Sequence, residues 1–230
     1  MNRNLISKTL AEIAGTFVLV FAGCGSIMIQ TRYGLESPLW VTPLVFGLAV
    51  ALMIYAVRHI SGAHFNPAVT LAFAVSRHFP KGQVLIYWAA QLVGAFAAIA
   101  LLKFILPAGS LYGATIPQVN SIASVIWEIL LTFQLMFVIT AVATDSRAQG
   151  IPASIAIGAA VMLGALVGGP VTGASMNPAR SLAPAVFQGT LDSVGIYFVG
   201  PFLGAVLAVL FYNLIRCESD HKVKTVKGCC

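Results

Sequence analysis

Charged residues are scarce in this sequence, and acidic ones are the scarcest. Only 9% of the 230 residues are charged, with 13 Lys and Arg against 7 Asp and Glu. A soluble domain carries about 25% charged residues, so an ordinary water-facing surface is excluded. The four cysteines have no regular spacing, which argues against a disulfide framework or a zinc site. Hydrophobic residues make up 59% of the chain, which excludes disorder and leaves a polytopic membrane protein.

Long apolar stretches give the number of membrane spans. A spanning helix needs about 20 mostly apolar residues. The fourth apolar stretch, residues 129–144, reaches that length only if its helix begins earlier, within 121–127. The fifth apolar stretch, residues 148–179, is too long for one helix and contains Gly168-Gly169-Pro170. It must therefore hold a span and a further element. We predict six transmembrane helices from the charge-free stretches 13–30, 37–57, 82–102, 129–144, 148–179 and 193–215.

The basic residues predict the orientation of these spans. Six spans put both ends of the chain on one side, and ten of the 13 Lys and Arg fall on that side. The positive-inside rule therefore predicts a multi-pass protein of the plasma or inner membrane with both ends in the cytoplasm. It also explains the net charge of +6 without nucleic acid as a partner. Residues 216–230 form a basic cytoplasmic tail in this interpretation.

An internal repeat divides the chain into two halves. The segment Gly62–Val75 is echoed 111 residues later by Gly173–Val186, and Glu12–Phe17 is echoed 116 residues later by Glu128–Phe133. We place the repeats at about 8–110 and 121–215 within a single domain, 1–230. Each repeat holds three spans, an odd number, so the second enters the membrane from the opposite face. Such inverted repeats place their functional site near the membrane midplane.

Two short segments at equivalent places in the repeats predict re-entrant half-helices. They cover 66–76 and 177–187, and 11 residues of helix measure about 16 Å, roughly half a bilayer core. Asn is a favoured N-cap and Pro suits the first helical position. The tetrapeptides before them must be extended, non-helical backbone, which is tolerated at membrane depth where it lines a wet cavity. Each segment begins with Asn-Pro-Ala: Asn66, Pro67 and Ala68, then Asn177, Pro178 and Ala179.

The duplicated Asn-Pro-Ala motif in a six-span inverted repeat resembles the major intrinsic protein family, the aquaporins and glycerol facilitators. The resemblance extends roughly from Leu10 to Ile215. It implies an all-α membrane fold, with six transmembrane helices and two re-entrant half-helices that meet N-terminus to N-terminus. It also implies one pore per subunit and a homotetramer in the lipid bilayer. The expected activity is passive conduction of water and small neutral solutes, without enzyme chemistry, cofactor or metal.

In such a pore, polar groups line the path of the solute. We expect Asn66 and Asn177 to cap the half-helices through their side-chain oxygens and to turn their amide donors toward the lumen. Two helix N-termini that face each other concentrate positive potential at the midplane, which opposes cations. Glu12 and Glu128 are expected to brace the re-entrant loops by accepting backbone N–H bonds. The expected acceptors are the backbone carbonyls of Gly62, Ala63, His64, Gly173, Ala174 and Ser175, with the ring of His64 as a further loop brace.

The family resemblance also implies a selectivity filter near the extracellular end. Its four positions match Phe46, Ala165 (or Gly164), Ala174 and Arg180. A guanidinium at Arg180 offers several donors to a passing oxygen and repels cations. Strict water channels carry His where this chain has a small residue, so a wider filter is expected. Residues 63–70 and 173–182 resemble the plant nodulin-like intrinsic proteins and their bacterial relatives, which conduct glycerol, urea or undissociated metalloid acids.

Three other functions are compatible with parts of the sequence. The nearest is a channel that conducts predominantly water. A secondary transporter could share the inverted-repeat plan, with Glu12 and Glu128 as the carboxylates for a coupling ion. A structural junction protein would conduct nothing. Gradient-driven, saturable flux would identify the transporter, and flux linear in solute concentration would identify the channel.

Overall fold

The computed structural model describes residues 3–106, 112–144 and 152–216, so most of the predicted tail and Arg147 lie outside the described residues. Six helices in the described part are long and apolar enough to span a membrane, which confirms the predicted number. The full order is α1 (Arg3–Tyr33), α2 (Val41–Ser61), α3 (Pro67–Val75), the one-turn 3-10 helix η1 (Lys81–Gln83), α4 (Val84–Ile105), α5 (Ser121–Thr144), α6 (Pro152–Thr172), α7 (Pro178–Gln188) and α8 (Ile196–Ile215).

Two of these helices settle the questions left by the apolar stretches. Helix α5 begins at Ser121, ahead of Glu128, as the length argument required. The Asn120 side chain accepts a hydrogen bond from the Ala123 N–H at 2.9 Å, which satisfies one free donor of the first turn. Helix α6 ends at Thr172 with Pro170 inside it. The long fifth stretch therefore contains a span followed by a re-entrant loop.

The half-helices differ slightly from their predicted bounds. Asn66 and Asn177 are N-caps, so α3 and α7 begin one residue later, at the prolines. Helix α3 has nine residues because Ser76 caps its C-terminus and the next residue turns back with φ of 64°. Helix α7 has eleven and ends before Gly189, a left-handed C-cap.

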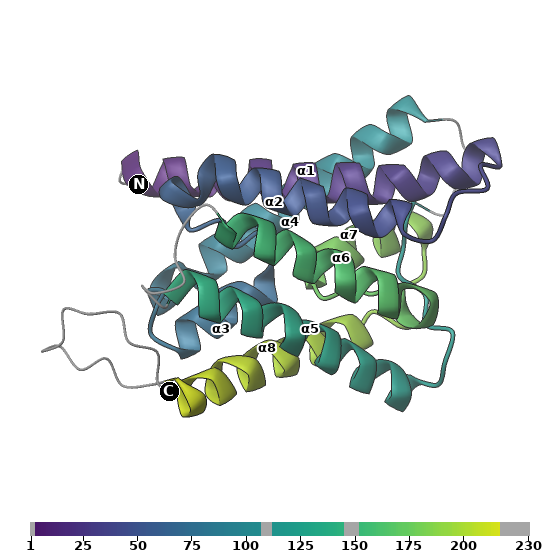
Figure 1. Cartoon of the computed structure of the whole chain (residues 1–230). Coiled ribbons are helices and arrows are strands. Elements are labelled where there is room, and N and C mark those ends of the chain that lie inside the picture. Colours follow the sequence, from purple (N-terminus) through teal and green to yellow (C-terminus); the bar gives the residue numbers. More distant parts are fainter. Residues whose placement is uncertain (1–2, 107–111, 145–151, 217–230) are drawn as a thin grey trace, which may run out of the picture.

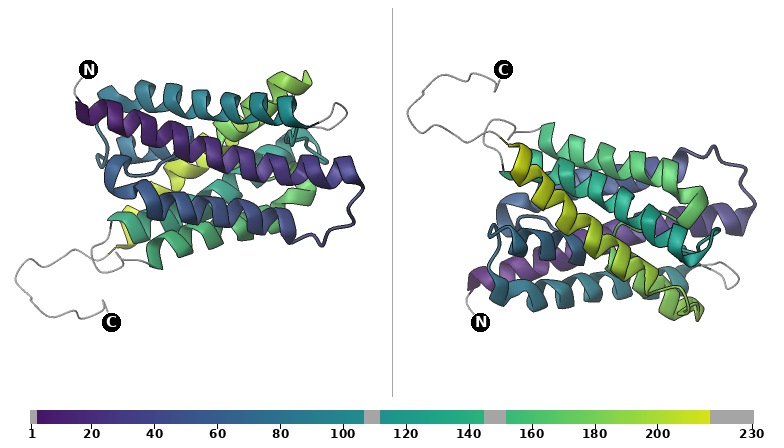
Figure 2. Two further views of the ribbon diagram at one scale, coloured as in Figure 1. Left: turned by 90° about the horizontal axis from the view of Figure 1, so that it is seen from above. Right: turned by 90° about the horizontal axis from the view of Figure 1, so that it is seen from below.

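The long helices form a bundle around the half-helices. Contacts run in the order α4, α1, α2, α6, α5 and α8, while α3 and α7 pack on α4 and α8 and touch each other. Figure 1 shows the start of α1 and the end of α8 at the same end of the bundle. The two views in Figure 2 show α1 between α4 and α2 from above, and α5 beside α8 from below.

Glycines allow the two halves to approach closely along a pseudo-two-fold axis. A Cβ on Gly47 would lie 2.6 Å from the Gly158 carbonyl oxygen, and one on Gly158 would lie 2.5 Å from that of Gly47. These residues are 111 positions apart, the offset of the repeat. Gly94 and Gly204 pack in the same way against the backbones of α1 and α5. A side chain at any of these crossings would force the helices apart.

Candidate functional site

The two Asn-Pro-Ala motifs meet at the centre of the bundle. The Asn66 side-chain oxygen accepts the Ala68 N–H at 2.9 Å, and the Asn177 oxygen accepts the Ala179 N–H at 3.0 Å. Each amide nitrogen also donates to the opposite loop, Asn66 to the Met176 carbonyl at 2.7 Å and Asn177 to the Phe65 carbonyl at 2.9 Å. The expected capping by the side-chain oxygens is observed, and the amides that were expected to turn toward the lumen also donate to the opposite loop. One N–H of each amide holds the two motifs together.

The loops before the two asparagines are non-helical, as predicted, but they are not extended. Backbone φ is 55° at Ala63 and 52° at Phe65, and 43° at Ala174 and 52° at Met176. Residues other than glycine rarely adopt positive φ, and each costs of order 1–3 kcal/mol. These positive φ values recur at equivalent positions in both repeats.

A buried carboxylate organises the first loop. Glu12, which is fully buried, accepts the N–H groups of His64 at 2.9 Å and Phe65 at 2.7 Å, one on each oxygen. The Ser61 hydroxyl and the Gln91 amide donate to it at 2.7 and 2.8 Å. Hydrogen bonds to a charged group contribute about 1.5–3 kcal/mol each, enough to offset the strain in the loop.

The second loop repeats this arrangement. Glu128, also fully buried, accepts the N–H groups of Ser175 and Met176, both at 2.9 Å. The Thr172 hydroxyl donates to it at 2.8 Å, as Ser61 does to Glu12. The Tyr197 hydroxyl then donates to the Thr172 carbonyl at 2.7 Å, and Tyr87 makes the equivalent bond to Ser61 at 2.8 Å.

One continuous cavity passes the two motifs. Arg180 and Phe46 line one end of it and Arg58 lines the other, with Asn66 and Asn177 between. Phe46 and Arg58 are twelve residues apart on α2, so the path is about 18 Å long at 1.5 Å per residue. The residues 67, 68, 178 and 179 do not line this cavity, because they form the buried first turns of α3 and α7.

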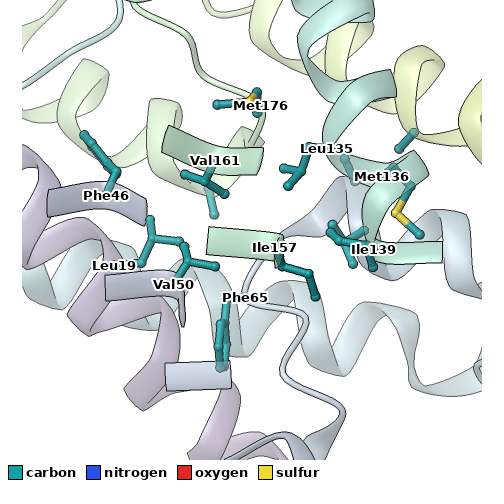
Figure 3. Close-up of a cluster of buried hydrophobic side chains, with 14 of the residues drawn as sticks. Leu19, Phe46, Val50, Phe65, Leu135, Met136, Ile139, Ile157, Val161 and Met176 are labelled. Carbon is teal, nitrogen blue, oxygen red and sulfur yellow. The ribbon is translucent and has the colours of Figure 1, made fainter. Parts of the chain in front are cut away.

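The cavity has one polar side and one apolar side. The loop residues Gly62, Ala63, His64, Ala174 and Ser175 line it, whereas Gly173 packs against Thr115 and is not among the lining residues. The role expected for the Gly173 carbonyl stays a prediction. Figure 3 shows the buried apolar side chains in this region, from which the opposite wall is built: Leu19, Phe46, Val50, Leu135, Ile139, Ile157 and Val161. An apolar wall leaves a solute dependent on the polar side for hydrogen bonds.

All four positions expected for a filter line the cavity: Phe46, Ala165, Ala174 and Arg180. The fifth-span register is resolved as well, since a Cβ on Gly164 would meet the Met176 sulfur at 2.6 Å. Arg180 is only 3% exposed, and its guanidinium lies 5.0 Å from the centre of the Phe46 ring. Two small side chains thus lie beside one aromatic ring and one guanidinium.

A segment between the two repeats holds this guanidinium. The Arg180 Nη1 donates to the Gly113 carbonyl at 2.8 Å, and the Thr115 hydroxyl donates to Ser181 at 2.9 Å. Sequence reasoning missed both residues, because 112–120 has no counterpart in either repeat. It also missed Gln91, Ser61 and Thr172. The repeat offset of 111 relates Ser61 to Thr172 and could have identified that pair.

The imidazole of His64 is held inside the first loop. Its Nδ1 lies 3.1 Å from the Thr70 hydroxyl, and its ring packs against Phe73, Phe79 and Tyr87 with centroid distances of 4.8–5.2 Å. Within the described residues, no group of three or more His, Cys, Asp or Glu is placed to hold a metal ion. The site as a whole can offer hydrogen bonds to a neutral solute along a narrow path.

Comparison with known proteins gives consistent matches over nearly the whole chain. A model of the major intrinsic protein family matches residues 2–212. Aquaporin NIP1-1 of Oryza sativa subsp. japonica is 49% identical over 92% of this chain and 75% of its own length. Nodulin-26 of Glycine max is 42% identical over 97% of this chain and 83% of its own length. The X-ray structure of the aquaglyceroporin from Plasmodium falciparum matches with a TM-score of 0.82 and 25% identity, covering 92% of this chain and 96% of that one.

Proposed function

Because the chain belongs to the major intrinsic protein family, and is therefore a passive membrane channel for water and small solutes rather than an enzyme, we propose that the cavity between Phe46 and Arg58 is its conduction path. The observation that carries the proposal is continuity. Both asparagine caps and all four filter positions line the same cavity. Its wall offers amide and backbone groups on one side and hydrocarbon on the other.

This path favours neutral molecules by electrostatics and by hydrogen bonding. A cation that enters would lose part of its hydration shell and then meet the Arg180 charge and the positive N-termini of α3 and α7. A molecule with hydroxyl or amide groups exchanges hydrogen bonds with Asn66, Asn177 and the loops as it advances. Water can use the same groups, and the apolar wall offers it no others. A chain of hydrogen-bonded waters is interrupted at the midplane, where both asparagines act as donors.

The size of the filter points to solutes larger than water. Ala165 and Ala174 bring single methyl groups to the constriction, and only Phe46 and Arg180 narrow it. We propose that glycerol, urea or undissociated metalloid acids pass, together with water. Relatives named as nodulin-26 and as an aquaglyceroporin support a wider filter in this chain. A channel conducting predominantly water is the second candidate, favoured by the Phe46 ring lying 5.0 Å from the guanidinium.

A reconstitution experiment separates these candidates. Protein in liposomes is followed by light scattering under a sucrose gradient and then a glycerol gradient, for wild type, Ala165→His and Ala165→Val. Rapid shrinkage in sucrose followed by reswelling in glycerol supports the wide filter. Reswelling should slow with Val and stop with His while water flux persists. Shrinkage without reswelling in the wild type would leave a water channel.

The transporter alternative loses its proposed ion site. Glu12 accepts four hydrogen bonds and Glu128 accepts three, all from the protein. A coupling ion would have to replace donors that hold the strained loops. Flux should therefore be linear in solute concentration and unaffected by a proton or sodium gradient. Saturation or gradient dependence in the same liposomes would restore the transporter.

We also propose the assembly and orientation of this channel. The chain is a multi-pass membrane protein, and each copy would form one complete channel domain within a homotetramer in the plasma or inner membrane. The basic excess at the end that holds Arg3, Arg58 and Arg216 supports an orientation with both ends of the chain in the cytoplasm. Chemical crosslinking of the protein in membranes tests the tetramer. Labelling of single cysteines at positions 36 and 77 by an impermeant reagent tests the orientation, because only position 36 should react from outside.

A further inference from the structure

A groove distinct from the conduction path lies where α3 ends and η1 begins. We call it the basic groove, and it is lined by Ala74, Arg77, His78, Phe79, Pro80 and Lys81. The side chains of Arg77, His78 and Lys81 are exposed. Among the described residues, those that line the groove include no Asp or Glu. Its chemistry therefore favours an anionic ligand.

The backbone around the basic groove is fixed by the core beneath it. The N–H groups of His78 and Phe79 both donate to the Phe73 carbonyl, at 2.9 and 3.1 Å. The buried Phe79 ring packs against Tyr87 and His64 with centroid distances of 4.5 and 4.8 Å. The shape of the groove is thus formed in advance, which reduces the entropy lost when a ligand binds.

Arg77 occupies a position where the backbone favours glycine. Its φ is 64°, in the left-handed region that glycine adopts at no steric cost. A residue held there against its preference suggests that its side chain has a role. Here that side chain is a guanidinium at the edge of the groove, and a guanidinium matches the geometry of phosphate oxygens.

The location of the groove identifies the source of the anion. It follows α3, and the left side of Figure 1 holds α3 together with the start of α1 and the end of α8. This end of the bundle also carries Arg3, Arg58 and Arg216. Within residues 3–106, 112–144 and 152–216, the exposed acidic residues are Glu36 and Asp192, which belong to the connections at the other end. Basic side chains at a membrane surface attract the headgroups of anionic lipids. We therefore take the headgroups of the surrounding bilayer as the source of the anion.

We propose that the basic groove binds the phosphate headgroup of an anionic lipid through Arg77 and Lys81. This site is independent of the proposed conduction path. The ligand phosphate lies against the guanidinium and the ammonium group, while its acyl chains follow the apolar surface of the bundle. Each cationic group near an anionic surface contributes about a fivefold gain in affinity, so removal of both should weaken binding about 25-fold.

Native mass spectrometry of the purified protein tests this site. Phosphatidylglycerol and phosphatidylcholine are added separately to the wild type, to the double variant Arg77→Gly, Lys81→Gln, and to Arg32→Gln. The last removes an exposed basic residue at the opposite end and serves as the matched control. Glycine suits the backbone at position 77, so the double variant should fold at least as well as the wild type.

The wild type and Arg32→Gln should retain phosphatidylglycerol in preference to phosphatidylcholine. The affinity of the double variant for phosphatidylglycerol should be about 25-fold lower, so that this preference is lost. Its water permeability in liposomes should be unchanged, which separates this result from the proposed conduction path. Equal retention of phosphatidylglycerol by the wild type and the double variant would overturn the proposal. So would an equal loss in Arg32→Gln. Displacement of the lipid by physiological inorganic phosphate would assign the groove to free phosphate instead.

Discussion

The first re-entrant loop is closed by side chains of its own repeat. Gln91 of α4 donates to Glu12 at 2.8 Å and to the Thr70 hydroxyl at 3.0 Å, and the same hydroxyl contacts His64. Carboxylate, amide, hydroxyl and imidazole form one buried network between α1 and α4. The first loop therefore needs nothing from outside residues 3–106 for these bonds.

The second loop carries the same buried carboxylate but has different support. The residue that corresponds to Gln91 is Pro201, which has no side-chain donor. Instead, Ser181 contacts Ser175 and receives a hydrogen bond from Thr115, which lies in the segment between the repeats. The comparison teaches that the second loop, the one followed by Arg180, depends on a segment outside the duplicated pattern. We infer that duplication gave each loop an equivalent carboxylate brace, and that the connecting segment adapted the second loop to support the proposed filter.

Substitution of Glu12 or Glu128 should have the largest effect on stability. It tests the feature that the two loops share, a buried carboxylate that accepts backbone N–H groups. Glu12→Gln and Glu128→Gln each place an amide N–H against a backbone N–H in a buried site. Each should lower the free energy of unfolding by at least about 3 kcal/mol. Unfolding in detergent, followed by Trp fluorescence, measures this loss, with the exposed Glu36→Gln as the control. A small effect at either brace would mean that the two carboxylates are not equivalent.

Gly113→Ala should disturb only the second loop. A Cβ there would lie 2.9 Å from the Cys24 Cα, and φ is 67°. Strain and overpacking together should cost about 2–3 kcal/mol and move the carbonyl that holds Arg180. Gly34→Ala is the matched control, because φ is 60° there and a Cβ would meet no atom within 4 Å. We expect greater cation leak through Gly113→Ala in liposomes, and unchanged leak would break the link between the segment and the filter.

The two caps offer a finer comparison. Asn66→Ala and Asn177→Ala each lose a cap and a bond to the opposite loop, which together should cost about 2 kcal/mol. The Asn177 oxygen also accepts the Arg180 N–H at 3.4 Å, so only this variant should raise cation leak. Measurements of stability and of leak in the same preparations distinguish the two effects. Equal leak in both variants would show that the caps control the filter jointly.

The smallest effects on stability should come from Gln91 and Thr115, the side chains that each support only one of the two loops. Gln91→Leu removes two donated bonds but also a buried amide oxygen that has no partner, so a loss of about 1 kcal/mol is expected. Thr115→Val removes one bond from the second loop and should cost a similar amount. Glycerol flux should fall only in Thr115→Val. A fall in Gln91→Leu alone would reverse the assignment of the second loop to the filter.

Much of this architecture could be predicted because its signals are local or repeated. Helix caps at Asn66 and Asn177 follow from residue type and position, and apolar length identifies the six spans. The nearly equal offsets indicate a repeat, and three spans in each half indicate an inverted arrangement before any contact is known. The φ values of Ala63 and Phe65 could not be predicted, because alanine and phenylalanine carry no preference for the left-handed region.

The sequence by itself thus determined the helices and the duplicated motif, since these depend on periodicity and short-range preference. The pairing of a carboxylate with each loop was expected from the symmetric repeat and the family resemblance, although Glu12 and His64 lie 52 positions apart. Tertiary structure alone decided that Ala165 and not Gly164 lines the cavity, and that the Gly113 carbonyl holds Arg180. The physical reason is packing. A hydrogen bond between a side chain and a backbone carbonyl 67 positions apart exists only where close packing brings the two segments together.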